Sequence, residues 1–285
     1  MNLFDHLTDQ ILINNRQLDT LRPVVEKEIL HQDILREMAR GGFLKKLTFI
    51  GGTCLRDCYN SPRLSEDLDF TGGIDFKKNE LSKLGRTLRD KISERYGMSV
   101  EVSEPHREFG DTSTWKIKII TRPERPDLPA QRIHIDICSV SSFDRKPTML
   151  LNHYQVDMGT SGLILYAESR EEILADKILA FVLRSNRVKQ RDLWDIVWLN
   201  NQIVKLRPEL IYPKLRERNI APSVFLQDFG KRIESIRNKQ KDFLFEIRRF
   251  LPSEVVNDTL KKPEYWNITI SLIEGLHKTL LKELS

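Results

Sequence analysis

The sequence predicts an α+β fold, in which strands and helices run to about residue 167 and helices follow to the end. Two observations predict it. Residues 47–70 contain an apolar strand, a glycine turn, a helix and a second strand. From Ser169 onward the apolar pattern is almost wholly helical. We therefore expect two domains, residues 1–167 and 168–285.

The remaining elements of the first part follow from periodicity and from glycine and proline positions. Residues 1–45 have apolar residues at helical spacing, and Gly41-Gly42 ends that helix. Residues 77–96 predict an amphipathic helix. Strand-like runs then follow at residues 98–102, 115–121, 132–140 and 162–166. In the second part, prolines divide the chain into five or six helices: Pro208, Pro213, Pro222, Pro252 and Pro263.

The composition is that of a soluble globular protein. The chain has 285 residues, of which 40% are hydrophobic and 31% are charged. A membrane span needs about 18 apolar residues in a row, and the sequence has no such run. The N-terminus lacks a secretory signal pattern, and three cysteines favour a reducing compartment, so we expect a cytoplasmic protein. Cys54, Cys58 and Cys138 are too few for a four-thiolate zinc site and are interpreted as small buried residues.

Charge is distributed unevenly along the chain. The net charge is +5, yet residues 1–75 hold 9 Lys/Arg against 12 Asp/Glu, so the excess of cations lies downstream. A basic C-terminal half indicates an anionic partner such as a nucleic acid. A solvated basic surface without a partner is the alternative. The same two interpretations apply to the basic segment from Lys231 to Arg249, where apolar residues are interleaved with cations.

Two aspartates are predicted to share one face of the second strand. Side chains alternate between the two faces of a strand, so Asp67 and Asp69 point the same way, while Leu68 and Phe70 point into a core. Carboxylates this close repel each other unless a cation lies between them.

The glycine turn before them is suited to an anion. Gly51 and Gly52 let backbone N–H groups approach a ligand, and they open a helix whose N-terminus favours negative charge. An anion site beside a carboxylate pair is what a metal-bound nucleoside triphosphate needs.

A third carboxylate lies on a later strand. Ile133, Ile135 and Ile137 face one way, whereas His134 and Asp136 face the other. If this strand neighbours the Asp67–Asp69 strand, the three aspartates offer the oxygen ligands that Mg²⁺ prefers. The alternative is an aspartate hydrogen-bonded to backbone amides. We interpret His134 as a strand residue rather than a base.

Charged residues also gather on two helices of the C-terminal part. Lys177 lies beside an apolar stripe, and Asp192 and Asp195 share a face of the next helix, where Arg191 can pair with Asp195. Four cations occupy the connection between these helices: Arg184, Arg187, Lys189 and Arg191. Such a corner is usually only solvated; if it faces the glycine turn, it supplies phosphate contacts.

These motifs resemble those of the AbiEii/AbiGii-type nucleotidyltransferase toxins, within the polymerase-β-like nucleotidyltransferase superfamily. The first signature is Gly51-Gly52-Thr53 followed by Arg63-x-Ser65-x-Asp67-x-Asp69-Phe70. The second is an acidic-then-lysine helix, Glu172 to Lys177, followed by Arg191-Asp192-Leu193-Trp194-Asp195. The resemblance covers roughly residues 45–200.

The resemblance implies a nucleotidyltransferase mixed sheet with flanking helices, an all-helical C-terminal domain, and an active-site cleft that this domain completes. It implies transfer of a nucleoside monophosphate (NMP) from an NTP, with Mg²⁺ or Mn²⁺, in the toxin of an abortive-infection toxin–antitoxin pair. The implied acceptor is RNA, such as the tRNA 3′ end, and a cognate antitoxin is the implied partner. The implied roles are triphosphate binding by Gly51, Gly52, Thr53 and Ser65, metal binding by Asp67 and Asp69, phosphate contact by Lys177, and completion of the pocket by Arg191, Asp192 and Asp195, with Asp192 or Asp195 catalytic.

Two other functions are compatible with the same residues. The enzyme could transfer NMP to a small molecule or to a protein hydroxyl. A nucleotide-binding protein without catalysis is the third hypothesis, and the intact Asp67–Asp69 pair argues against it.

Overall fold

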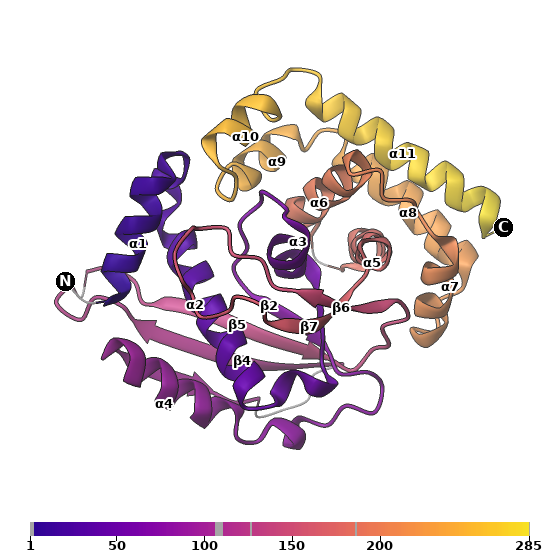
Figure 1. Cartoon of the computed structure of the whole chain (residues 1–285). Helices are drawn as coiled ribbons and strands as arrows, with labels where there is room; N and C mark the ends of the chain where they lie inside the picture. Colours follow the sequence, from indigo (N-terminus) through magenta and orange to yellow (C-terminus); the bar gives the residue numbers. More distant parts are fainter. Residues whose placement is uncertain (1–2, 106–110, 126, 186, 285) are drawn as a thin grey trace. The chain divides into compact units, whose positions relative to one another are not determined.

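The computed structural model of the protein describes residues 3–105, 111–125, 127–185 and 187–284. The chain divides into two compact units, Met1–Glu168 and Ser169–Ser285. Figure 1 shows the strands in the first unit and the helices of the second, coloured from orange to yellow. The prediction of strands and helices followed by helices alone is confirmed.

The N-terminal unit is built on a mixed seven-stranded sheet in the order β3-β4-β5-β2-β1-β7-β6. Strands β2 and β5 are parallel, as are β1 and β7, and the other neighbours are antiparallel. The strands are β1 (Thr48–Ile50), β2 (Leu68–Thr71), β3 (Ser99–Ser103), β4 (Thr112–Ile120), β5 (Gln131–Cys138), β6 (Arg145–Met149) and β7 (Ile164–Glu168). The α-helices of this unit are α1 (Leu3–Asn14), α2 (Arg22–Arg40), α3 (Gly51–Tyr59) and α4 (Leu84–Tyr96), and its short 3-10 helices are η1 (Arg16–Leu21), η2 (Phe43–Lys46) and η3 (Lys78–Leu81).

One face of the sheet carries the core. Phe49, Phe70 and Ile135 are completely or almost completely buried on β1, β2 and β5, and the rings of Phe49 and Phe70 stack with centroids 5.0 Å apart. Helix α2 packs against β5, and α4 packs against β3 and α2. Burying this apolar area on both helices fixes which face of each strand points inward.

The opposite face of the central strands is polar. On β5 the isoleucines are buried, whereas His134, Asp136 and Cys138 are partly exposed, in strict alternation. This confirms the predicted facing of that strand. It also corrects one expectation: Cys138 is partly exposed rather than buried like Cys54 and Cys58.

The C-terminal unit consists of helices α5 to α11. They are α5 (Arg170–Leu183), α6 (Gln190–Asn201), α7 (Pro208–Glu217), α8 (Pro222–Ile236), α9 (Gln240–Ile247), α10 (Ser253–Asp258) and α11 (Tyr265–Glu283). Helix α5 begins where predicted because the Ser169 side chain caps it, accepting a hydrogen bond from the Glu172 N–H at 3.1 Å. None of the described helices is long and apolar enough to cross a bilayer.

The structure departs from the predicted elements in four places. The described part of the C-terminal unit has seven helices instead of the predicted five or six, because the turn between α8 and α9 contains no proline to signal it. Strand β6 is absent from the prediction, because the segment Arg145–Met149 is mostly exposed and contains a proline. Pro213 lies inside α7 instead of ending a helix. Asp67 lies in a bend just before β2 rather than on the strand itself.

Candidate active site

The backbone of the glycine turn lies so close to Asp69 that only glycine fits at Gly51. Strand β1 ends at Ile50, and α3 starts at Gly51, whose φ of +77° lies in the left-handed region. A Cβ atom at Gly51 would lie 2.8 Å from Asp69 Oδ2. A side chain at this position would therefore be strained by the backbone and would also collide with the carboxylate.

Gly52 and Thr53 join the first turn of α3 to the loop before β2. A Cβ atom at Gly52 would lie 2.3 Å from Nη2 of the buried Arg63. Thr53 Oγ1 is hydrogen-bonded to Ser65 Oγ at 2.8 Å and to the carbonyl oxygen of Asp67. Thr53, completely buried, and Ser65, 7% exposed, thus hold the loop against the helix N-terminus.

The three predicted site aspartates of the N-terminal unit, Asp67, Asp69 and Asp136, lie on or just before two neighbouring parallel strands. Asp69 on β2 and Asp136 on β5 are register partners, as the sequence predicted for neighbouring strands. Asp67 Oδ1 accepts a hydrogen bond from the backbone N–H of His134 at 3.1 Å and lies 3.5 Å from its Nδ1. Thr114 Oγ1 donates to Asp136 Oδ1 at 2.6 Å. Each strand therefore presents a carboxylate to the polar face at the same level of the sheet.

The donor set suits a divalent cation that also binds substrate. Among the described residues, no group of three or more His, Cys, Asp or Glu side chains forms a ready-made metal cage. Mg²⁺ usually takes only one or two carboxylates and completes its shell with waters and substrate phosphates. The paired oxygen donors of Asp69 and Asp136, beside the glycine turn, fit that requirement.

Sequence reasoning missed the residues that support this loop from α2. The buried Glu28 carboxylate accepts hydrogen bonds from the Ser65 N–H at 3.3 Å and from Arg56 at 3.2 Å, and the Tyr154 hydroxyl donates to it as well. Burial lowers the pKa of Arg56, but Glu28, Tyr154 and Asp57 together outweigh this effect and leave that pKa raised. The one sequence signal was an acid within the apolar pattern of α2, which alone does not indicate burial.

Lys27 and His31 of α2 hold the same loop one residue further along. Lys27 Nζ lies 2.9 Å from Glu66 Oε1, and His31 donates from Nε2 to the Glu66 carbonyl at 3.0 Å. Burial lowers the pKa of His31 and so favours the neutral imidazole, although the hydrogen bond to the Glu66 carbonyl acts in the opposite direction.

In the C-terminal unit, three of the predicted residues meet. Lys177 Nζ on α5 lies 2.8 Å from Asp192 Oδ1 and 2.8 Å from Asp195 Oδ2, both on α6. Arg184 Nη2 reaches Asp192 Oδ2 at 3.3 Å. Asp195 is completely buried, and the Lys177 side chain is 12% exposed. A lysine fixed by two carboxylates in this way is held at a defined position on α5.

Arg191 lies against α9 and the segment that follows it. Its Nε is 3.7 Å from Glu246 Oε1, and its guanidinium carbon is 4.8 Å from the centroid of the Phe250 ring. The predicted members of the site thus form two sets, one in each unit, and their joint action in one reaction stays a prediction.

A second buried lysine, which pairs with α5 from helix α7, was not predicted. Lys214 of α7 is 1% exposed and lies 2.8 Å from Glu172 Oε1 and 2.9 Å from Asp176 Oδ1, both on α5. Because lysine at a helical position normally indicates solvent exposure, this cluster has no signal in the sequence pattern.

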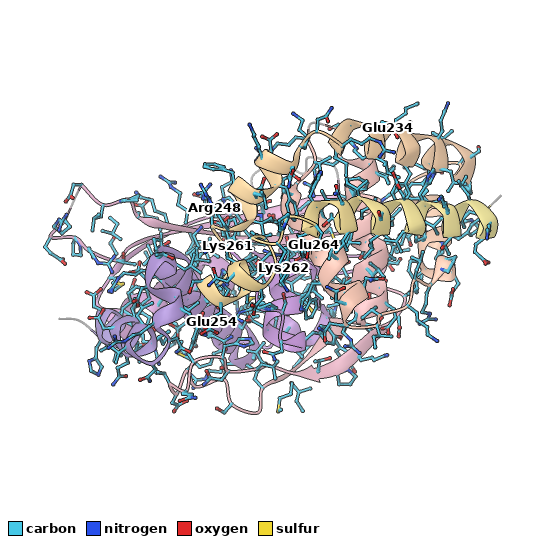
Figure 2. All side chains as sticks on the ribbon, turned by 90° about the horizontal axis from the view of Figure 1, so that it is seen from above. Glu234, Arg248, Glu254, Lys261, Lys262 and Glu264 are labelled. Carbon is cyan, nitrogen blue, oxygen red and sulfur yellow. The ribbon has the colours of Figure 1, made fainter. Side chains whose placement is uncertain are left out.

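The basic segment from Lys231 to Arg249 forms the end of α8, helix α9 and the turn between them. Several of its cations face carboxylates of the same unit: Arg237 lies 2.8 Å from Glu234 and 2.7 Å from Glu274, and Lys231 lies 2.9 Å from Asp228. Figure 2 labels three cations and three carboxylates of this unit in one view: Arg248, Lys261, Lys262, Glu234, Glu254 and Glu264. The mixture of signs favours the interpretation of an amphipathic, solvated surface.

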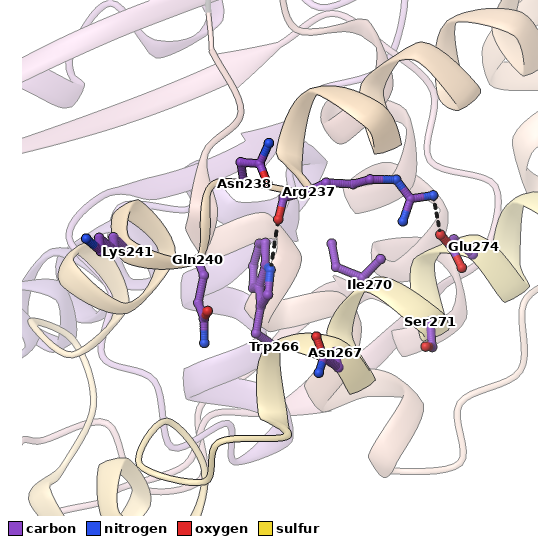
Figure 3. Close-up of a pocket in the computed structure, with 9 residues that line it drawn as sticks. All are labelled: Arg237, Asn238, Gln240, Lys241, Trp266, Asn267, Ile270, Ser271 and Glu274. Atoms are coloured by element: carbon purple, nitrogen blue, oxygen red, sulfur yellow. Dashed lines mark hydrogen bonds and ion pairs between the residues drawn. The ribbon is translucent and has the colours of Figure 1, made fainter.

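A pocket of about 750 Å³ lies between the α8–α9 turn and α11 (Figure 3). Trp266 forms part of its wall and donates from Nε1 to the Arg237 carbonyl at 3.2 Å. Amides and a hydroxyl line much of the rest: Asn238, Gln240, Asn267 and Ser271. The described residues that line this pocket include none of the predicted site carboxylates, so we assign it no part in the chemistry.

The fold and the site together define a nucleotidyltransferase: a mixed sheet, a glycine turn opening a helix, and aspartates on the adjacent strands. The chain belongs to the family described as nucleotidyl transferase AbiEii toxin, type IV toxin–antitoxin system, whose sequence model matches residues 33–267. It is thus a toxin nucleotidyltransferase, and membership in this family implies an NTP substrate and a cognate antitoxin.

Solved structures share the fold at low sequence identity. MenT4, a nucleotidyltransferase toxin from Mycobacterium tuberculosis, is 16% identical with a TM-score of 0.57, covering 98% of this chain and 90% of that one. JHP933 from Helicobacter pylori is 17% identical with a TM-score of 0.51, covering 91% and 94%. A putative nucleotidyltransferase from H. pylori is 16% identical with a TM-score of 0.51, covering 91% and 96%. The search of curated proteins gives no match.

Proposed function

We propose that the protein transfers NMP from an NTP to a hydroxyl group of an RNA, such as the 3′ end of a tRNA, with Mg²⁺ or Mn²⁺ as cofactor. The observation that supports this most strongly is the pairing of Asp69 with Asp136 beside the Gly51 turn. Those groups offer oxygen ligands for a cation and backbone donors for phosphates within one unit of the chain.

In this proposal, Asp67, Asp69 and Asp136 hold the divalent cation, while Gly51, Gly52, Thr53 and Ser65 hold the triphosphate. When bound, the cation neutralises phosphate charge and lowers the pKa of the acceptor hydroxyl. The contribution of the chain itself is positioning, because the Thr53 and Glu28 hydrogen bonds fix the loop that carries Ser65 and Asp67.

The transfer step is a substitution at the α-phosphorus. The acceptor oxygen forms a bond to that phosphorus while the bond from phosphorus to the pyrophosphate oxygen breaks, and pyrophosphate leaves. The hydroxyl proton passes to solvent. Thr114 donates to Asp136 Oδ1 and so holds this proposed metal ligand in orientation.

We also propose that residues 168–285 contribute Lys177, Arg191, Asp192 and Asp195 to the same reaction, Lys177 and Arg191 as phosphate contacts. The support is the fixed position of Lys177 between two carboxylates on α6. The excess of cations among residues 169–285, 22 Lys/Arg against 16 Asp/Glu, favours an anionic acceptor.

The acceptor is identified by incubating the protein with each of the four NTPs, labelled on the α-phosphate, and a total cell extract. RNA, protein and small molecules are then separated. We expect the label in RNA, and we expect RNA whose 3′-terminal ribose has first been oxidised with periodate to accept none. Label confined to protein or to small molecules would identify that fraction, rather than RNA, as the acceptor. NTP binding without any transferred label would show that the protein binds nucleotides without catalysing transfer.

A further inference from the structure

A separate hollow lies on the polar face of the same sheet, beyond the carboxylates. Its volume is about 340 Å³, and we call it the Thr71 hollow. Thr48 of β1 and Thr71 of β2 are two of the residues that line it, Gly73 and Ser141 lie in the loops after β2 and β5, and Lys46 and Arg145 bring two cations. All of these residues belong to the N-terminal unit.

Strand register places the hollow next to the predicted metal ligands. Thr48 pairs with Thr71, and Ile50 pairs with Asp69. Residues two apart on a strand share a face, so Thr71 and Asp69 point to the same side and are separated by about 7 Å along β2. The hollow and the carboxylates are thus neighbouring parts of one surface.

The lining suits a phosphate group. Arg145 Nη1 donates to Thr48 Oγ1 at 3.4 Å, and its guanidinium carbon is 4.8 Å from the centroid of the Tyr166 ring. These two contacts hold an exposed arginine over the hollow. Lys46 adds a second cation, although its Nζ also pairs with Glu80 at 2.7 Å. Asp75 contributes one carboxylate to the lining. The Thr71 hydroxyl is engaged with the Val140 carbonyl and the Gly73 N–H, so the hydrogen-bond donors to a phosphate here are the two cations, of which arginine is the one suited to bidentate phosphate contact.

The direction of the reaction decides which phosphate this is. The glycine turn follows the Ile50 end of β1, whereas the hollow lies at the Thr48 end, with Asp69 between them. In an in-line displacement, the attacking oxygen lies on the side of the α-phosphorus opposite the leaving pyrophosphate. A triphosphate bound at the glycine turn therefore directs its pyrophosphate away from the hollow, and leaves the hollow to the acceptor.

We propose that the Thr71 hollow binds a backbone phosphate of the acceptor strand, next to the hydroxyl that is modified, with Arg145 as its main contact. This inference rests on the proposed function, and it adds a specificity-determining residue outside the two signature motifs. It predicts a preference for a nucleic-acid acceptor over a free nucleoside or a protein hydroxyl.

The test compares Arg145→Gln with Lys146→Gln. The two residues are consecutive on β6 and point to opposite faces, so the second variant removes the same charge from the same strand without touching the hollow. Arg145→Lys serves as the conservative variant. Each protein is assayed for NMP transfer with RNA and NTP varied in turn, and for RNA binding at several salt concentrations, after its thermal unfolding has been compared with that of the wild type.

We expect Arg145→Gln to raise the KM for RNA about tenfold, with the KM for NTP and kcat changed less than about twofold, and to reduce the salt slope of RNA binding by about one. Arg145→Lys should recover part of the affinity, and Lys146→Gln should behave as the wild type. An unchanged KM for RNA in Arg145→Gln would overturn the inference. A raised KM for NTP instead would assign the phosphate to the donor and would also overturn it. A wild-type protein that modifies no RNA would instead refute the proposed function itself.

Discussion

Among single residues, Gly51 links the backbone most directly to the chemistry. Its φ of +77° is one reason for glycine at this position, and the 2.8 Å that would separate a Cβ atom from Asp69 Oδ2 is another. Gly97, the residue after α4, has a φ of +66° but no atom within 4 Å of its Cβ position. Comparing alanine substitutions at Gly51 and Gly97 therefore distinguishes the effect of backbone strain, which both share, from the effect of crowding the Asp69 carboxylate, which only Gly51 has.

We predict that Gly51→Ala and Gly97→Ala each destabilise the protein by about 1–2 kcal/mol, the cost of a side chain in the left-handed region. Only Gly51→Ala should also lose NMP transfer, because its methyl group displaces Asp69. Urea denaturation and a transfer assay on the folded variants measure the two effects. Equal activity in both variants would show that the close approach to Asp69 does not matter for the reaction.

The residues of this site differ in how far the sequence predicted them. Gly51, Asp67 and Asp69 lie within one strand–turn–helix–strand unit, and the pairing of its two strands brings Asp69 beside the glycine turn. Asp136 is distant in sequence, and its predicted place depends on its strand neighbouring β2, which the register confirms. The role of Glu28 could not be predicted from the sequence, because its burial depends on its contacts with Arg56 and Ser65 rather than on any local pattern.

Among the helices and strands, α5 joins two buried lysine–carboxylate clusters. Lys177 and Lys214 each lie 2.8–2.9 Å from two carboxylates, and Asp195 and Glu172 have no exposed surface. Removing either lysine takes a cation away from a buried carboxylate, which is costly in the same way at both sites. The two clusters differ in that only Lys177 belongs to the predicted active site.

We predict that Lys177→Met and Lys214→Met each lower the free energy of unfolding by about 3 kcal/mol. Three of the four tryptophans lie in the C-terminal unit, so tryptophan fluorescence follows its unfolding. At a temperature where both variants are folded, Lys177→Met should lose NMP transfer and Lys214→Met should keep it. Similar activity in the two variants would assign Lys177 a structural role only.

The helices and strands differ in how well the sequence predicted them. Strands β4 and β5 were predicted from their apolar residues, and the structure shows the alternation of buried and partly exposed residues that such a pattern indicates. Strand β6 was not predicted, because it is an edge strand without an apolar face. Among the described strands it pairs with β7 alone. Pro213 lies within α7, whereas the sequence indicated a break there, because a proline inside a helix normally removes a hydrogen bond.

For the molecule as a whole, a histidine of the N-terminal unit contributes to the pH dependence of stability. Burial, assisted by the nearby charge of Arg56, lowers the pKa of His153 to about 4. The unfolded chain binds this proton near pH 6.5 and the folded chain only near pH 4. The stability that His153 contributes is therefore complete above about pH 6.5 and is lost as the pH falls to about 4.

We predict that this histidine contributes about 3 kcal/mol to the loss of stability between pH 6.5 and pH 4. His153→Gln keeps an N–H for the Arg56 carbonyl, which His153 Nε2 contacts at 2.9 Å, and should show a smaller fall in Tm on acidification. His6→Gln, on the exposed side of α1, is the matched control and should retain the wild-type pH profile. Identical profiles for all three proteins would show that His153 does not set this dependence.

The proposed chemistry requires that the carboxylates beside the glycine turn direct transfer of the α-phosphoryl group of an NTP. The most direct measurement supplies NTP labelled on either the α- or the γ-phosphate to the wild type, to Asp69→Asn and to Asp90→Asn, whose carboxylate is half-exposed on α4. We predict α-label in the acceptor for the wild type and Asp90→Asn, a loss of about a thousandfold in folded Asp69→Asn, and γ-label in none. Full activity of Asp69→Asn, or transfer of the γ-label, would contradict this mechanism.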